Sequence, residues 1–76
     1  MDIGKIVKGA KLRVSVDEMV IYRAGGTIAG KRFHKGAILF CGVPLGNGDI
    51  ELRSDGDEHL YHAGKEFLAA RVDQAK

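Results

Sequence analysis

This chain lacks several features, and each absence argues against a class of protein. The single cysteine, Cys41, cannot form an internal disulfide, so the chain is not a disulfide-stabilised secreted domain. No apolar run approaches the roughly 18 residues that a membrane-spanning helix needs. The first residues lack the charged and apolar regions of a signal peptide. These absences predict a cytoplasmic protein that contacts no membrane.

The length of 76 residues predicts one domain over 1–76. A chain of this size buries only about 60% of its unfolded surface. Without a disulfide, further burial would come most naturally from a partner subunit, so a homodimer is one expected assembly. Residues 1–9 are expected to form an edge strand or an arm that docks on assembly, and residues 73–76 a frayed tail.

Glycine, by contrast, is abundant, with 11 residues that divide much of the chain into short apolar runs. Glycine turns the chain through positive φ at little cost, and the runs are rich in β-branched residues, so the pattern indicates short strands. The expected strands, the last two paired as a hairpin, are 11–16, 19–22, 37–41, 50–53 and 58–62. The most apolar run, 37–41, is expected to be the central strand. Residues 23–27 are expected to turn at Gly25-Gly26, and 28–35 to form a loop or a short irregular strand. The spacing over 65–72 fits either one helical turn or a closing strand.

Five or six short strands with one helical turn near the C-terminus predict an all-β fold, namely a small, partly open barrel. Two stretches resemble the SH3-like class of such barrels. Ile6–Val14 resembles the strand that opens the barrel, and Phe33–Leu39 is similar to the step from Lys-Gly into an apolar strand in bacterial SH3 and KOW-type domains. The resemblance implies the fold alone. Bacterial SH3 domains carry an aromatic-rich ligand groove, whereas this chain has no tryptophan.

The clearest functional candidate is the basic stretch 31–35, where Lys31, Arg32 and Lys35 surround Phe33. Arg23 extends it. Cations hold phosphates and an aromatic ring stacks on a base, so this combination is typical of single-stranded nucleic-acid binding. With a protein partner, Arg32 and Phe33 would be the anchors and the two lysines would steer the encounter. The alternative is that Phe33 belongs to the core and its neighbours only keep a loop soluble.

The charge of the chain is distributed unevenly, although its net value is only +2. Residues 1–36 hold eight basic and three acidic side chains, whereas residues 37–76 hold four basic and seven acidic ones. A fold built from these halves could present one positive and one negative face. The small net charge favours a protein partner over nucleic acid.

Metal and catalytic sites have little support in the sequence. The segment 55–62 holds three acids and two histidines, but His59 and His62 would lie on opposite faces of a strand, and the acids do not follow the EF-hand spacing. No metal ligand is therefore assigned, although Asp57, His59 and His62 remain an alternative metal site. Cys41 sits in the most apolar run, and no phosphate-binding motif is present, so we expect neither an enzyme nor a cofactor.

The sequence therefore predicts a non-catalytic binding module, an adaptor or inhibitor acting through its surface on another macromolecule, with protein favoured as the partner. A short chain of this kind is typical of phage or mobile-element accessory proteins. The alternative is a single-stranded nucleic-acid binder in which Arg13 and Arg23 join the stretch 31–35.

Overall fold

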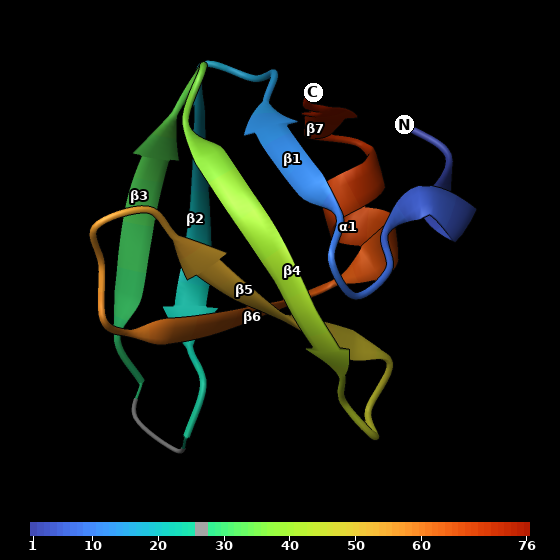
Figure 1. Ribbon diagram of the computed structural model, residues 1–76. Helices are drawn as coiled ribbons and strands as arrows, with labels where there is room; N and C mark the ends of the chain where they lie inside the picture. Colours follow the sequence, from blue (N-terminus) through green and yellow to red (C-terminus); the bar gives the residue numbers. More distant parts are fainter. Residues whose placement is uncertain (26–27) are drawn as a thin grey trace.

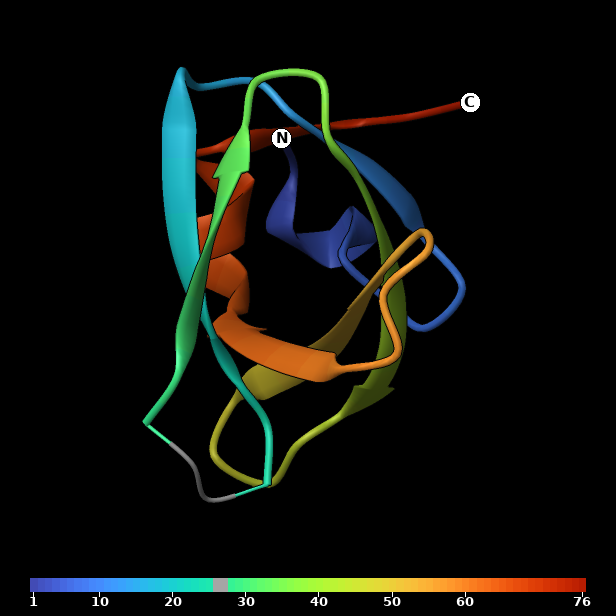
Figure 2. The same cartoon turned by 90° about the vertical axis from the view of Figure 1, so that its left-hand side faces the viewer.

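The fold is a single antiparallel sheet that coils around its own core (Figures 1 and 2). The computed structural model describes residues 1–25 and 28–76. The seven strands follow the spatial order β3-β2-β6-β5-β4-β1-β7. Their bounds are β1 (Lys11–Val14), β2 (Glu18–Arg23), β3 (Gly30–His34), β4 (Ile38–Pro44), β5 (Asp49–Ser54), β6 (Leu60–Gly64) and β7 (Val72–Gln74). A 3₁₀ turn, η1 (Ile3–Lys5), precedes the sheet, and a short helix, α1 (Lys65–Ala69), connects β6 to β7.

The predicted mostly β fold with one short helix near the C-terminus is confirmed. The sheet has seven strands, where five or six were expected, and it does not close into a barrel. Its two edges are β3 and β7, which do not pair with each other. The likeness to SH3-like domains stays a prediction. Among the described residues, no helix is both long enough and apolar enough to cross a membrane.

Alternation of apolar and polar residues explains the inner face of the sheet. In β1, for example, Leu12 and Val14 are buried while Arg13 is exposed. In β5, Ile50 and Leu52 are buried in the same way. The buried cluster consists of Ile6, Leu12, Val14, Met19, Ile21, Phe33, Leu39, Cys41, Ile50, Leu52, Tyr61, Ala63, Leu68 and Val72.

Residues 28–35 were expected to be a loop or a short irregular strand. A short strand is present as β3, but the expected irregularity is wrong. β3 pairs with β2 over five consecutive positions, from Tyr22↔Gly30 to Glu18↔His34. Gly30 does not interrupt the strand because the side chains of β2 cover it. A Cβ atom at Gly30 would lie 3.1 Å from Val20 Cγ1 and 3.2 Å from Tyr22 Cε1, so a larger residue would have to displace these side chains slightly. Of the turn expected at 23–27, positions 26 and 27 lie outside the described residues.

All of the apolar run 37–41 except Ala37 lies in β4, which extends to Pro44 and lies between β1 and β5. The middle position of the sheet belongs to β5, so the expectation of a central strand at 37–41 is wrong in detail. The run is also not buried on both sides. Leu39 and Cys41 face the core, whereas Phe40 faces outward and is 39% exposed.

Both ends of the chain differ from their predictions. The first residues form η1 and not an edge strand or arm, because Ile6 is fully buried and the Met1 ammonium group donates a hydrogen bond of 2.9 Å to the Ala69 carbonyl. The tail expected to fray contains β7, which pairs with β1, and the Ala75 N–H donates to the Lys11 carbonyl at 2.8 Å. The segment 65–72 thus holds a helix followed by the first residue of a strand.

Candidate functional site

The five residues predicted to bind a partner lie at the end of β2, along β3 and in the turn that follows, but they do not share one face. Phe33 is only 5% exposed, and its ring packs edge-on against Tyr61 at a centroid distance of 5.6 Å. This buried position contradicts the prediction that Phe33 anchors a partner and agrees with the alternative that it belongs to the core. Lys31 faces the same side of β3 as Phe33, with its ammonium group 5.2 Å from the centre of that ring. Arg32 points to the opposite side.

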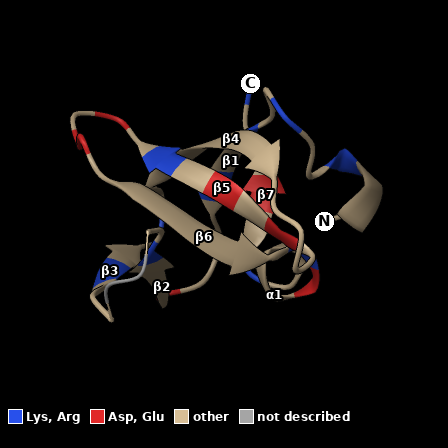
Figure 3. Ribbon diagram, turned by 90° about the horizontal axis from the view of Figure 1, so that it is seen from below, with Lys and Arg blue, Asp and Glu red and all other residues tan. Residues whose placement is uncertain are grey.

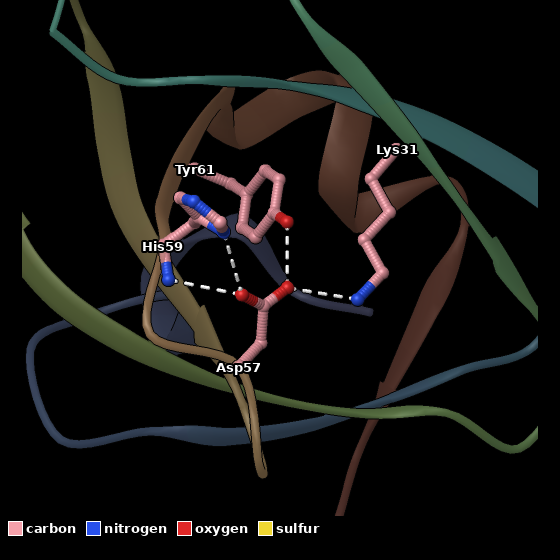
Figure 4. A network of polar contacts seen from close by, with 4 residues as sticks. All are labelled: Lys31, Asp57, His59 and Tyr61. Carbon is pink, nitrogen blue, oxygen red and sulfur yellow. Dashed lines mark hydrogen bonds and ion pairs between the residues drawn. The ribbon is translucent and has the colours of Figure 1, made fainter.

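Lys31 belongs to a polar network centred on Asp57, in the turn between β5 and β6 (Figure 4). Its Nζ lies 2.8 Å from Asp57 Oδ2, which also accepts a hydrogen bond of 2.6 Å from the Tyr61 hydroxyl. The other carboxylate oxygen, Oδ1, accepts the backbone N–H of His59 at 2.9 Å and lies 3.0 Å from His59 Nδ1. Both oxygens of one carboxylate are therefore held by three other residues.

The electrostatics of this network follow from these contacts. The hydrogen bonds from Lys31, then Tyr61, then His59 hold the pKa of Asp57 well below its usual range. The hydrogen bond to Asp57 raises the pKa of Lys31. Burial, and then the hydrogen bond to Asp57, raises the pKa of Tyr61. At neutral pH the network is thus an ionised carboxylate, an ammonium group and a neutral phenol.

The network connects parts of the sheet that no strand pairing joins. β3 pairs with β2 only, so its other side is an edge. Lys31 reaches from this edge to the turn between β5 and β6, as Figure 4 shows. The ion pair therefore ties the edge strand to the opposite turn, and Lys31 is engaged within the molecule.

The remaining predicted cations are more exposed. Arg32 lies on the outer face, where its Nε is 3.6 Å from Glu18 Oε2, and both side chains are more than half exposed to solvent. A surface pair of this kind contributes little to stability. Lys35 is exposed in the turn after β3, while Arg23 is half-buried. Figure 3 shows basic positions on β3 and acidic positions on the turn between β5 and β6, the two elements that the Lys31–Asp57 ion pair connects.

A cleft of about 680 Å³ lies beside the network. One wall is Ala29 with the first two residues of β3, Gly30 and Lys31, and the other is the turn 55–58. Its volume falls in the range of ligand sites, about 300–1,000 Å³. Its central polar groups are bonded to one another, so it offers a place for a ligand but no arrangement of nucleophile and base.

The edge of β3 borders this cleft with unpaired backbone groups. Arg23 N–H donates to the Ala29 carbonyl and Lys35 N–H to the Asp17 carbonyl, at the two ends of the β2–β3 ladder. Antiparallel hydrogen bonding alternates, so Lys31 and Phe33 direct their backbone groups toward β2, while Gly30, Arg32 and His34 direct theirs away from it. Among the described residues, only the His34 carbonyl of this outward set finds a partner, the N–H of Ala37.

The alternative metal site is not assembled. His62 Nδ1 lies 2.7 Å from Asp49 Oδ2, while His59 contacts Asp57. The described part of the chain contains no group of three or more histidine, cysteine or acidic side chains that could hold a metal ion.

Cys41 is predicted to react slowly with thiol reagents in the folded protein. It is 6% exposed, and burial raises the pKa of its thiol, so little thiolate forms at neutral pH. We expect modification by a chromogenic disulfide reagent to be at least about tenfold slower in buffer than in denaturant. Equal rates in both would show that β4 opens readily.

Comparison with known proteins gives no relative. No protein-family model matches the chain, and no curated protein or solved structure is significantly similar to it.

Two arrangements of side chains were not predicted from the sequence. Asp57 and Tyr61 were not connected with Lys31, because Lys31 and Asp57 are 26 positions apart and only their opposite charges hinted at a contact. The second arrangement is a row of outward side chains on β1, β4 and β5, which no stretch of the sequence contains.

Proposed function

We propose that the protein is a non-catalytic protein-binding module that adds an extended segment of its partner to the free edge of β3. The observation that carries the proposal is the outward backbone of Gly30 and Arg32, which is unpaired among the described residues. Gly30 also lines the cleft of about 680 Å³. Strand addition uses such an edge, because main-chain hydrogen bonds supply affinity whatever the partner's sequence. Val20 and Tyr22 on the neighbouring strand are 39% and 51% exposed and add apolar contact surface.

The charge of the edge favours a foreign partner over a second copy. Residues 30–35 hold three basic and no acidic side chains. Two copies of β3 paired antiparallel about their middle outward residue would set Arg32 directly opposite its counterpart, and like charges in that position are destabilising. An acidic side chain of the partner in the same position would be favourable. The preferred partner is therefore an extended, acidic segment of another protein.

The proposal predicts that proline at position 32 abolishes binding without unfolding the protein. The Arg32 N–H points away from β2, so Arg32→Pro removes a donor to the partner and none from the β2–β3 ladder. The probes are two capped seven-residue peptides, in which valine and threonine alternate around a central glutamate or lysine. Amide NMR titration should show shifts at Gly30, Arg32 and His34, and the glutamate peptide should bind a few-fold more tightly.

The matched control is Arg32→Thr, which removes the same charge but keeps the N–H. It should bind both peptides with similar affinity. If Arg32→Pro retains a native spectrum and binds as well as Arg32→Thr, partner segments do not pair with β3. Shifts confined to another surface would contradict the proposal equally.

A further inference from the structure

Three side chains that are distant in sequence form a row across the outer face of the sheet. Lys11 in β1 is paired with Phe40 in β4, and Phe40 is paired with Arg53 in β5. Each has a buried neighbour in its own strand, for example Leu12 and Leu52, so the row faces away from the core. Phe40 thus lies between two cations on the surface, and we refer to these three residues as the outer row.

Phe40 is available to an external ligand. Its side chain is 39% exposed. The aromatic rings in aromatic and cation–π contacts are Phe33, Tyr61 and Phe67, and within residues 1–25 and 28–76 no cation covers the Phe40 ring. Lys11 Nζ donates to the backbone carbonyl of Lys76 at 3.1 Å, and Arg53 is exposed. Both cations therefore flank the ring without occupying it.

We propose that the outer row binds single-stranded nucleic acid, with a base stacked on Phe40 and phosphates held by Lys11 and Arg53. A single exposed aromatic residue is ordinary, but an aromatic residue with a cation directly opposite on both sides matches the two parts of a nucleotide. Two strand spacings, about 10 Å, separate the outer cations, which suits a short stretch of one strand. The ligand is shared by DNA and RNA, because the row offers no assigned group for the 2′-hydroxyl.

The charges beside the outer row limit where a bound oligonucleotide can lie. Arg13 follows Lys11 on the same face of β1, although Asp73 of β7 lies opposite it. At the other end, a hollow lined by Phe40 and Arg53 is bordered by the acidic turn 55–58. The carboxylates of this turn repel phosphates. The bound oligonucleotide should therefore extend from Arg53 toward β1 and not over the turn. Of the two surfaces, the outer row suits nucleic acid better than residues 31–35, where Lys31 is bound to Asp57 and Phe33 is buried.

The test is fluorescence anisotropy with labelled oligothymidylate and oligouridylate of about twelve nucleotides, at low and moderate salt. The wild-type protein should bind with a Kd of about 10⁻⁶–10⁻⁴ M at low salt and lose affinity as salt rises. Phe40→Ala should weaken binding about tenfold or more, while Phe40→Tyr should restore it to within about twofold. Lys11→Gln and Arg53→Gln should each reduce the slope of log Kd against log salt by about 0.7. Asp55→Asn should tighten binding.

Arg32→Gln removes the same charge from the other surface and should leave binding unchanged. The proposal is overturned if neither oligonucleotide binds at low salt, if Arg32→Gln weakens binding as much as Arg53→Gln, or if Phe40→Ala and Phe40→Tyr bind like the wild type. A preference for oligouridylate would identify RNA as the source of the ligand. Equal affinity for both would show that the row recognises only the base and phosphate that DNA and RNA share. These outcomes are independent of strand addition, since the peptide titration monitors β3 and leaves the outer row unaltered.

Discussion

Replacing Leu68 by alanine is expected to lower the free energy of unfolding by about 2–5 kcal/mol, as for other fully buried leucines. Leu68 is fully buried and is the buried residue of α1. The helix has only five residues, and its N-cap, Gly64, makes no side-chain hydrogen bond, so α1 is too short to be stable by itself. Packing of Leu68 against the core therefore holds the helix and, through the chain, fixes where β7 begins.

The expected loss for Leu68→Ala is large relative to the total free energy of unfolding of the protein. A domain of this length has a free energy of unfolding of about 4–11 kcal/mol. Urea denaturation followed by circular dichroism measures the difference. Glu66→Ala, on the exposed side of the same helix, is the control and should change the stability by no more than about 0.5 kcal/mol. If Leu68→Ala costs as little as Glu66→Ala, the helix is not held by this contact.

The sequence predicted best those strands whose signals are local. β1 alternates apolar and polar residues, and β5 and β6 flank the Asp55-Gly56 turn, so their faces and their pairing follow from short stretches. At β3 a loop stayed open as an alternative and a regular strand was not expected, because Gly30 and consecutive basic residues are poor strand signals. Gly30 is accommodated in β3 because Val20 and Tyr22 of β2 cover it. This cover depends on the pairing between the two strands. The same holds for β7, whose three residues become a strand only by pairing with β1.

The candidate site was only partly predicted, again because the pairing between strands cannot be seen in a short stretch of sequence. Residues 31–35 attract attention because their cations are adjacent in sequence, but alternation along β3 sends Arg32 to one face and Phe33 to the other. The residues of the outer row, by contrast, are distant in sequence and adjacent in the structure. Its residues become neighbours only through the registers of β1 with β4 and of β4 with β5, so composition and spacing could not reveal it.

Asp57→Asn is expected to make the protein less stable at neutral pH and to flatten its loss of stability in acid. The wild-type carboxylate is held by Lys31, Tyr61 and His59, so its pKa in the folded protein lies well below the usual value of 3.8. Asparagine keeps the size of the side chain but has no charge for Lys31, and its amide group would face hydrogen-bond donors. The edge of β3 then loses its tie to the turn between β5 and β6.

The direction of the pH effect follows from linkage. Below about pH 4 the unfolded chain binds a proton at Asp57 while the folded protein does not, so the unfolded state binds more protons and stability falls as the pH falls. The contribution of this carboxylate is therefore complete above its usual pKa and is lost progressively as the pH falls toward the lowered one. In this window the wild type should take up as much as about one more proton on unfolding than Asp57→Asn.

Urea midpoints measured between about pH 2.5 and pH 7 test this argument. The wild type and Asp57→Asn should differ most at neutral pH and converge in acid. Asp55→Asn removes an exposed carboxylate from the same turn, one that makes no hydrogen bond among the described residues, and its curve should run parallel to the wild type. A constant difference between wild type and Asp57→Asn at every pH would mean that packing alone, and not the ionised carboxylate, holds β3 to the turn. Convergence in acid would instead show that one carboxylate fixes the strand whose free edge we propose as the binding surface.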